Sequence, residues 1–269
     1  MGGAIRYVRL LGSLGRFSLA RELAFRGNFL AKVSVEVLWL AILMAFYRTI
    51  FGRTSGIAGW SEHQYFFFVG CFYTLNGLIE TLFFENCNEF AELVRTGDLD
   101  FLLLKPIDEQ FLISCRKIDW STGVNVLLGG MVMGFSLKQL HWQFDMARLA
   151  AFLVAFTCGI LILYSFMLML TSVSVWMVRN QSLMEMWWLF SSLVRYPKEI
   201  FSGTWAAGIG KFFTFVVPIL LVANVPAEAM VRTLDWRWIG GIVVATVVAM
   251  FVSRKFFQKA LRSYRSASS

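Results

Sequence analysis

Charged residues are scarce in this sequence. They make up 16% of its 269 residues, whereas hydrophobic residues make up 58%. A soluble globular chain usually contains about 25% charged residues and about 45–50% apolar residues. Because so few polar residues cannot cover so large an apolar excess with a water-soluble surface, we expect a protein whose surface faces lipid.

Residues that build catalytic and metal centres are also few. The two histidines, His63 and His141, lie far apart, and the four cysteines lack the close spacing of metal ligands. There is no HExxH motif and no nucleophile elbow, and the Gly-Lys pair at 210–211 is not followed by the serine or threonine of a phosphate-binding loop. We therefore expect a non-catalytic chain with no metal site and no cofactor, and any ATP with its Mg would be bound by a partner chain.

Long apolar runs occupy most of the chain. A helical crossing of a membrane needs roughly 20 mostly apolar residues. The region 182–223 is irregular, because an apolar run is followed by a polar block around Pro197 and then by a second apolar run. We interpret this region as one crossing followed by a segment that re-enters the outer half of the membrane, with two full crossings as the alternative. The other predicted crossings lie at 28–51, 64–84, 120–137, 149–178 and 238–252.

Positive charges gather at both ends of the chain. Five arginines lie within 1–27, and five lysines or arginines lie within 254–265. Positive residues near the ends of crossings favour the cytoplasmic side, so both termini are expected in the cytoplasm and the number of crossings should be even. The sequence thus predicts an all-α integral membrane protein with six transmembrane helices. Its formal charge of +8 fits this orientation and contact with an anionic lipid bilayer, and we expect no nucleic-acid partner.

One transmembrane domain is expected over 1–269. Residues 1–27 are predicted to form an amphipathic helix on the cytoplasmic surface of the membrane, with a plain positive flank as the alternative. The six-helix bundle should span 28–254, and a basic cytoplasmic tail should follow at 255–269.

Polar residues inside the predicted crossings are few. Asn76, Glu80 and Asn125 are the main ones, together with Glu36. Placing ionisable groups inside a membrane costs free energy, so such residues are candidates for function. We take Asn76, Glu80 and Asn125 as candidates for a substrate pathway, although each could simply bond to a neighbouring helix. So sparse a polar lining favours an amphipathic or hydrophobic substrate over an ion or a sugar.

The segment after the second predicted crossing is unusually acidic for a cytoplasmic segment. A helix over 85–96 would place acidic residues on one face and apolar residues on the other, and Gly97 would end it in a left-handed conformation. An apolar strip follows and stops at Pro106. Docking to a soluble protein accounts for this pattern, because apolar area gives affinity and charge gives orientation; a solvated acidic loop is the alternative. The predicted contact residues are Glu85, Glu89, Phe90, Glu92, Val94, Arg95, Gly97, Asp98, Leu99, Asp100, Lys105 and Pro106.

The same segment carries a family resemblance. "RTGDLDFLLLKPID", with matches at Gly97, Leu99, Asp100, Leu104, Lys105 and Pro106, resembles a signature of permease subunits in the ABC-2 type transporter family. The blocks "RYPKEIFSG" and "FVVPILLVANVPAEAM", which hold Pro197, Pro218, Asn224 and Pro226, are similar to later blocks of a six-span bacterial subgroup of that family.

This resemblance implies a fold and a function. Family members lie in the plasma (inner) membrane, pair with an identical or related permease, and bind two copies of a separate ATPase subunit. It implies that the helix at 85–96 is a coupling helix between crossings 2 and 3 that rests on the ATPase. It also implies that roughly 200–232 forms short re-entrant helices before the last crossing. Export is the expected direction. A transporter driven by an ion gradient is the alternative, and a membrane-embedded enzyme or assembly scaffold is a third possibility.

Overall fold

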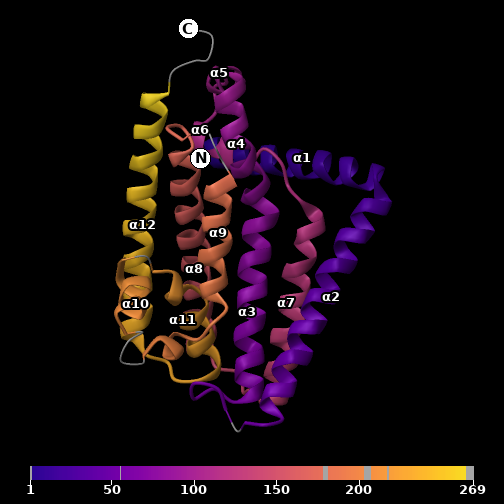
Figure 1. Ribbon diagram of the computed structural model, residues 1–269, viewed down its shortest axis with the longest axis vertical. Helices are drawn as coiled ribbons and strands as arrows, with labels where there is room; N and C mark the ends of the chain where they lie inside the picture. Colours follow the sequence, from indigo (N-terminus) through magenta and orange to yellow (C-terminus); the bar gives the residue numbers. More distant parts are fainter. Residues whose placement is uncertain (1, 55, 178–180, 203–206, 217, 265–269) are drawn as a thin grey trace.

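The protein is a helical bundle in which the longest helices run side by side (Figure 1). The computed structural model describes residues 2–54, 56–177, 181–202, 207–216 and 218–264. Within these ranges all regular secondary structure is helical, apart from an isolated bridge between Ile57 and Trp60. The all-α prediction is therefore confirmed for the described part of the chain.

Five helices in the described ranges are long and apolar enough to cross a membrane, judged by length and composition. One of them is continuous over Glu62–Thr96, because α3 runs through a π-helical segment, η1, into α4. All five overlap predicted crossings. Their bounds are α2 Arg26–Phe51, α3 Glu62–Ile79 with η1 Glu80–Phe84 and α4 Glu85–Thr96, α7 Trp120–Gln139, α8 Met146–Val173, and α12 Trp236–Ser263.

The sixth crossing stays a prediction. The helix in its place, α9 (Gln181–Val194), has 14 residues, which is shorter than the roughly 20 residues that a crossing needs. It begins directly after 178–180, which lie outside the described residues. The last residue of the predicted crossing 149–178 lies outside them too.

Aspartates mark where several helices begin. Asp119 accepts hydrogen bonds from the backbone N–H groups of Ser121 and Thr122 at the start of α7, and Asp145 and Asp235 do the same for α8 and α12. The first backbone N–H groups of a helix have no partner within the helix, so a side-chain acceptor there stabilises the start by about 1 kcal/mol. These aspartates thus fix the residue at which each long helix begins, which an uninterrupted apolar sequence would not define.

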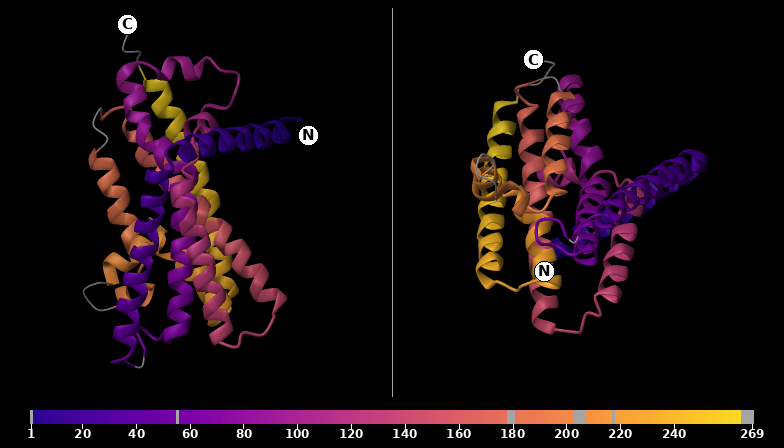
Figure 2. Two further views of the ribbon diagram at one scale, coloured as in Figure 1. Left: turned by 90° about the vertical axis from the view of Figure 1, so that its right-hand side faces the viewer. Right: turned by 60° about the horizontal axis from the view of Figure 1, so that its bottom comes forward.

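One end of the bundle carries a compact extension, which we call the cap (residues 85–119). It consists of α4, α5 (Leu99–Leu103), α6 (Glu109–Ser114) and the loop that leads to α7. The N-terminal helix α1 (Gly2–Ala24) runs across the long helices near this end and projects away from the bundle (Figures 1 and 2). The last turns of α12 reach the same end and include 255–263, which were predicted as the start of a basic tail, whereas 265–269 lie outside the described residues.

Short helices fill the opposite half of the bundle, where the re-entrant segment is predicted (Figure 1). α11 is almost entirely buried and packs against α3, α8 and α9. Parts of the predicted segment, 203–206 and 217, lie outside the described residues. The described short helices are η2 Lys198–Ser202, α10 Ala207–Lys211, η3 Phe212–Val216 and α11 Ile219–Val231.

Candidate functional site

A cavity of about 540 Å³ lies between α2, α3, α7 and α9. Asn76, Glu80 and Asn125, the three predicted pathway residues, all line it. Glu36 of α2 and Arg195, just beyond α9, line it as well. The structure thus brings together polar residues from four separate segments, and we call this space the central cavity.

Aromatic side chains form much of the wall of the central cavity. Phe72 and Tyr73 come from α3, Trp39 and Phe46 from α2, and Trp188 from α9. Trp39 is 61% exposed and Trp188 is 51% exposed, so the cavity is bordered on the α2–α9 side by side chains that face away from the bundle. A space with aromatic walls and a few polar groups suits a molecule that is apolar at one end and polar at the other.

Two polar atoms at the cavity lack a partner within the described part of the chain. The amide nitrogen of Asn125 donates to Oε2 of Glu36 at 2.9 Å, but its Oδ1 accepts no hydrogen bond, although Asn125 is 95% buried. The guanidinium of Arg195 lies 5.4 Å from the ring centroid of Phe72, and its buried Nε has no acceptor. Because unsatisfied buried polar groups are costly, both atoms are available to a bound molecule.

Close packing of α3 on α7 positions these residues. A Cβ atom built on Gly77 would lie 2.8 Å from the Cβ atom of Asn125, so the two helices meet there without room for a side chain. Just beyond, Glu80 begins η1, where the helix widens. Thr81 fixes this widened turn, because its hydroxyl donates to the carbonyl of Gly77 at 2.6 Å and lies 3.3 Å from the hydroxyl of Thr122. π-Helical turns within longer helices often occur at functional sites.

Arg195 was not among the predicted site residues. Its sequence neighbourhood, an apolar run followed by "RYPKEIFSG", gave no sign that the side chain would face α3. Its own segment is held in place by Asn224 of α11, which accepts a hydrogen bond from the backbone N–H of Lys198 at 3.0 Å. An arginine next to an apolar run of helical length is the one sequence signal that marks it.

The acidic residues of α4 are not equivalent. Glu89 accepts hydrogen bonds from Arg116, at 2.5 Å, and from Lys117. Glu85 lies 3.6 Å from Nζ of Lys117. These two predicted contact residues are therefore paired with cations of their own chain. Glu92, by contrast, faces outward and is paired with Arg95 on the exposed side of the same helix.

Three of the predicted contact residues are interior residues of the cap. Phe90 and Leu99 are fully buried and Val94 is 9% exposed. They pack in one cluster with Leu168 of α8 and Phe257 of α12. Their burial anchors the cap on the bundle, and a partner protein would not contact them in this arrangement.

The apolar strip after Gly97 forms a short helix. Gly97 ends α4 in the left-handed region, with a φ of +82°, as the sequence predicts. The strip that follows, for which no secondary structure was predicted, is the short helix α5, in which Leu99 and Leu102 are one turn apart and both buried. Phe101 and Leu104 consequently point outward and are 69% and 81% exposed.

Phe101 and Leu104 were not among the predicted contact residues. They stand beside Asp98, Lys105 and Pro106, which are also exposed. Exposed large apolar side chains rimmed by polar residues are typical of surfaces that bind a protein or a membrane. Their three-residue spacing, alternating with the buried leucines, was the signal in the sequence. We call Phe101, Leu104 and the flanking Glu92 and Asp98 the cap tip.

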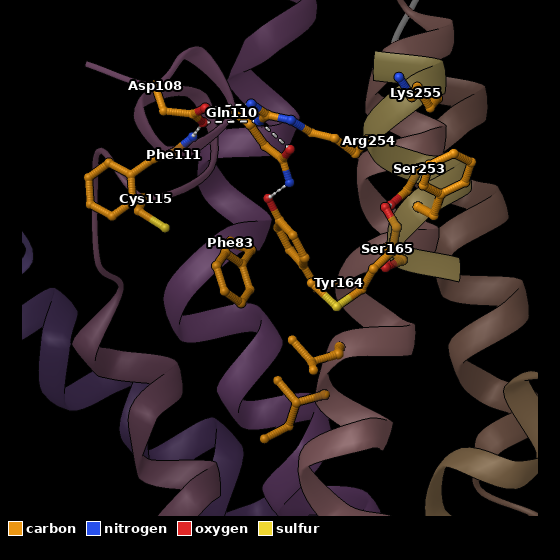
Figure 3. Close-up of a pocket in the computed structure, with 14 residues that line it drawn as sticks. Phe83, Asp108, Gln110, Phe111, Cys115, Tyr164, Ser165, Ser253, Arg254 and Lys255 are labelled. Atoms are coloured by element: carbon orange, nitrogen blue, oxygen red, sulfur yellow. Dashed lines mark hydrogen bonds and ion pairs between the residues drawn. The ribbon is translucent and has the colours of Figure 1, made fainter. Parts of the chain in front are cut away.

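A polar chain ties the cap to the bundle (Figure 3). Arg254 of α12 donates to both carboxylate oxygens of Asp108, at 3.0 and 2.5 Å. Gln110 accepts from the same guanidinium and donates to the hydroxyl of Tyr164 in α8. The donation from Arg254 holds the pKa of Asp108 below its ordinary value, so this carboxylate is charged at neutral pH. The backbone N–H of Asp108 also donates to the hydroxyl of Tyr7 in α1 at 3.0 Å.

Comparison with known proteins identifies the family of the chain. Neither a curated protein nor a solved structure shows significant similarity to the chain. Among the described residues, no group of three histidine, cysteine or acidic side chains is placed to hold a metal ion. A family model described as "ABC-2 family transporter protein", however, matches residues 37–268. With that match covering most of its length, the chain belongs to the ABC-2 family of transporter permeases and is a multi-pass membrane protein.

Proposed function

We propose that this chain is the permease of an ATP-driven exporter and that it is moved by a separate ATPase bound at the cap tip. The observation that carries the proposal is the continuous helix Glu62–Thr96. Glu80 of the central cavity and Glu92 of the cap tip lie on this helix, 12 residues apart, which corresponds to about 18 Å at 1.5 Å per residue. A push or pull on the cap tip is therefore transmitted along one rigid element to the cavity wall.

The central cavity supports an amphipathic substrate. Its aromatic walls offer apolar contact, and the carboxylates of Glu36 and Glu80 with Oδ1 of Asn125 offer hydrogen-bond acceptors. A molecule with a hydrophobic body and a polar end that donates hydrogen bonds fits this lining. Export is the transport direction that the family resemblance implies.

A pair of permeases with two ATPase copies is the proposed assembly. The exposed side chains of Trp39 and Trp188 border the central cavity on the side where no element of this chain covers it in the described structure. A second permease, identical or related, would close the cavity there. We propose that both termini and the cap lie in the cytoplasm of a bacterium and that the bundle lies in its inner membrane; the basic ends of the chain support this orientation.

An ion-gradient transporter is the second candidate. Its support is the presence of two carboxylates, Glu36 and Glu80, in one cavity, because intramembrane carboxylates serve as proton carriers in such transporters. Efflux that stops with a protonophore while cellular ATP persists would favour it over the ATP-driven exporter.

The decisive experiment replaces the two apolar residues of the cap tip. In a Phe101→Ser/Leu104→Ser double variant, we expect the recovery of the ATPase that co-purifies with the full-length chain to fall by about tenfold or more, because exposed apolar anchors dominate the affinity of such interfaces. Phe144→Ser/Met146→Ser is the matched control, since these residues are 70% and 66% exposed at the opposite end of the bundle.

Two measurements complete this test. The purified permease alone should hydrolyse no ATP, and the complex with its ATPase should. Equal recovery of the ATPase with the cap-tip variant and the control would refute docking at the cap tip.

A further inference from the structure

The central cavity carries charges of opposite sign at two different levels. Glu36 and Glu80 mark one level, because the amide nitrogen of Asn125 donates to Glu36 at 2.9 Å and the same side chain interacts with Glu80. Arg195 marks the other level, where its guanidinium lies beside the ring of Phe72. Phe72 precedes Glu80 by eight residues, so the two levels are about 12 Å apart along α3 at 1.5 Å per residue.

None of these three charged side chains is neutralised within the described part of the chain. Glu36 and Glu80 form no ion pair with a lysine, arginine or histidine there, and Arg195 forms none with an acidic residue. All three are only partly exposed. Partly buried charges without partners are costly, and neighbouring carboxylates repel each other. A molecule that brings a cation to the carboxylates and an anion to the guanidinium removes both costs.

The wall between the two charged levels suits a chain of amide groups. Asn76 lies midway between them, one turn from each along α3, and Tyr73 beside it interacts with all three charged residues. Oδ1 of Asn125 lacks a hydrogen-bond donor, and Nε of Arg195 lacks an acceptor, within the described residues. A peptide backbone supplies both kinds of partner, since each residue carries one N–H and one C=O. The aromatic remainder of the wall suits apolar side chains.

The separation of the charges sets the length of such a peptide. An extended chain advances by about 3.3–3.6 Å per residue, so about four residues span the roughly 12 Å between the two levels. The ammonium and the phosphate of an ethanolamine headgroup, by contrast, are joined by only two carbon atoms. A zwitterionic lipid headgroup therefore cannot occupy both charged levels at once.

We propose that the central cavity takes a short apolar peptide of about four residues whose two ends are free. Its terminal ammonium lies between Glu36 and Glu80, its terminal carboxylate lies at Arg195, and one of its N–H groups donates to Oδ1 of Asn125. Its side chains contact the aromatic wall. This inference rests on the proposed function, because it names the substrate class of the same cavity.

Peptide binding to the permease without its ATPase tests the proposal. The full-length chain in lipid nanodiscs is equilibrated by dialysis with the radiolabelled tetrapeptide LAAL, and empty nanodiscs correct for partitioning into lipid. The same peptide is prepared with an acetylated amine, with an amidated carboxylate, or with both ends blocked. We expect each singly blocked form to bind about tenfold more weakly than LAAL, because each loses one desolvated charge contact. The dipeptide LL should also bind about tenfold more weakly, since it reaches only one charged level.

Charge-neutral variants assign each end of the peptide to its level. Glu36→Gln/Glu80→Gln should abolish the preference for a free amine and keep the preference for a free carboxylate, whereas Arg195→Gln should do the reverse. Glu109→Gln and Lys138→Gln are the matched controls, because both residues are exposed and lie outside the cavity, and they should keep both preferences. A general loss of structure removes both preferences together, so this crossed pattern separates a binding role from a structural one.

Three results would overturn the proposal. They are equal affinities for the free and blocked peptides, a preference for only one free end in the wild-type chain, and tighter binding of lysophosphatidylethanolamine than of LAAL. These results are independent of the docking test at the cap tip. Failure of the ATPase to bind there would refute the proposed coupling and leave the peptide affinities unchanged, whereas equal peptide affinities would refute the substrate class and leave the coupling intact.

Discussion

Asn86 holds the loop before α7 against α4 through both ends of its side-chain amide. Its nitrogen donates to the backbone carbonyl of Lys117 at 2.7 Å, and its oxygen accepts from the backbone N–H of the same residue at 2.8 Å. The side chain is 1% exposed. Because buried backbone groups need partners, this side chain helps to hold the loop on the helix.

Replacement of Asn86 tests this role at the residue scale. Asn86→Leu leaves the N–H and C=O of Lys117 unpaired, which costs about 1–3 kcal/mol for each group. We expect the melting temperature of the purified protein in detergent to fall clearly, and Asn88→Leu, at an exposed position of the same helix, to change it less. Equal melting temperatures for the two variants would contradict the assignment.

At the scale of elements, α4 separates a structural face from a contact face. Glu89 is turned toward Arg116 and Lys117, whereas Glu92 is turned outward with Arg95. The periodicity of the sequence placed both acids on one side of the helix, but that side is wide enough to border both the loop before α7 and solvent. The loop before α7 covers the part of this side where Glu89 lies, and Glu92 stays exposed to solvent.

Two neutral replacements separate these faces. Glu89→Gln removes the partner of Arg116 and Lys117, so we expect a lower melting temperature together with weaker retention of the ATPase. Glu92→Gln should leave the free energy of unfolding within about 0.5 kcal/mol of wild type, because exposed ion pairs contribute little to stability, and should weaken ATPase retention alone. If Glu92→Gln destabilised the protein as much as Glu89→Gln, this division of α4 would be wrong.

At the scale of the whole molecule, the bundle depends on the close approach of α3 and α7. A Cβ atom on Gly129 would lie 2.7 Å from the carbonyl oxygen of Gly70 and 2.7 Å from the backbone nitrogen of Thr74. Small residues allow helix backbones to approach in this way in membranes, where lipid provides no hydrophobic force between helices. The same contact surface continues to Gly77 and Asn125 and thus shapes the central cavity.

Neighbouring glycines provide a matched test of this contact. Gly129→Ala should push α3 and α7 apart, because two of the obstructing atoms belong to the backbone and cannot rotate away, and we expect a loss of about 1–3 kcal/mol of stability from such overpacking. Gly130→Ala should be tolerated, because a Cβ atom there has no neighbour within 4 Å. Melting curves of the two variants in detergent give the comparison, and equal curves would contradict the proposed packing.

The sequence by itself determined the local properties of this protein. Apolar runs predicted long helices, and Gly97 marked the end of α4. The few polar residues in the runs at 64–84 and 120–137 identified Asn76, Glu80 and Asn125 as a group, and the segment at 97–106 indicated the family. Each of these features depends on residues within a few turns of one another.

Only the tertiary structure decided which distant residues meet. It placed Arg195 at the central cavity, paired Glu89 with Arg116 and Lys117, and left Phe101 and Leu104 outside when α5 packed on the bundle. Sequence periodicity fixes the direction of a side chain relative to its own helix. What lies in that direction depends on how all the helices pack together, and this packing involves contacts between residues far apart in the chain.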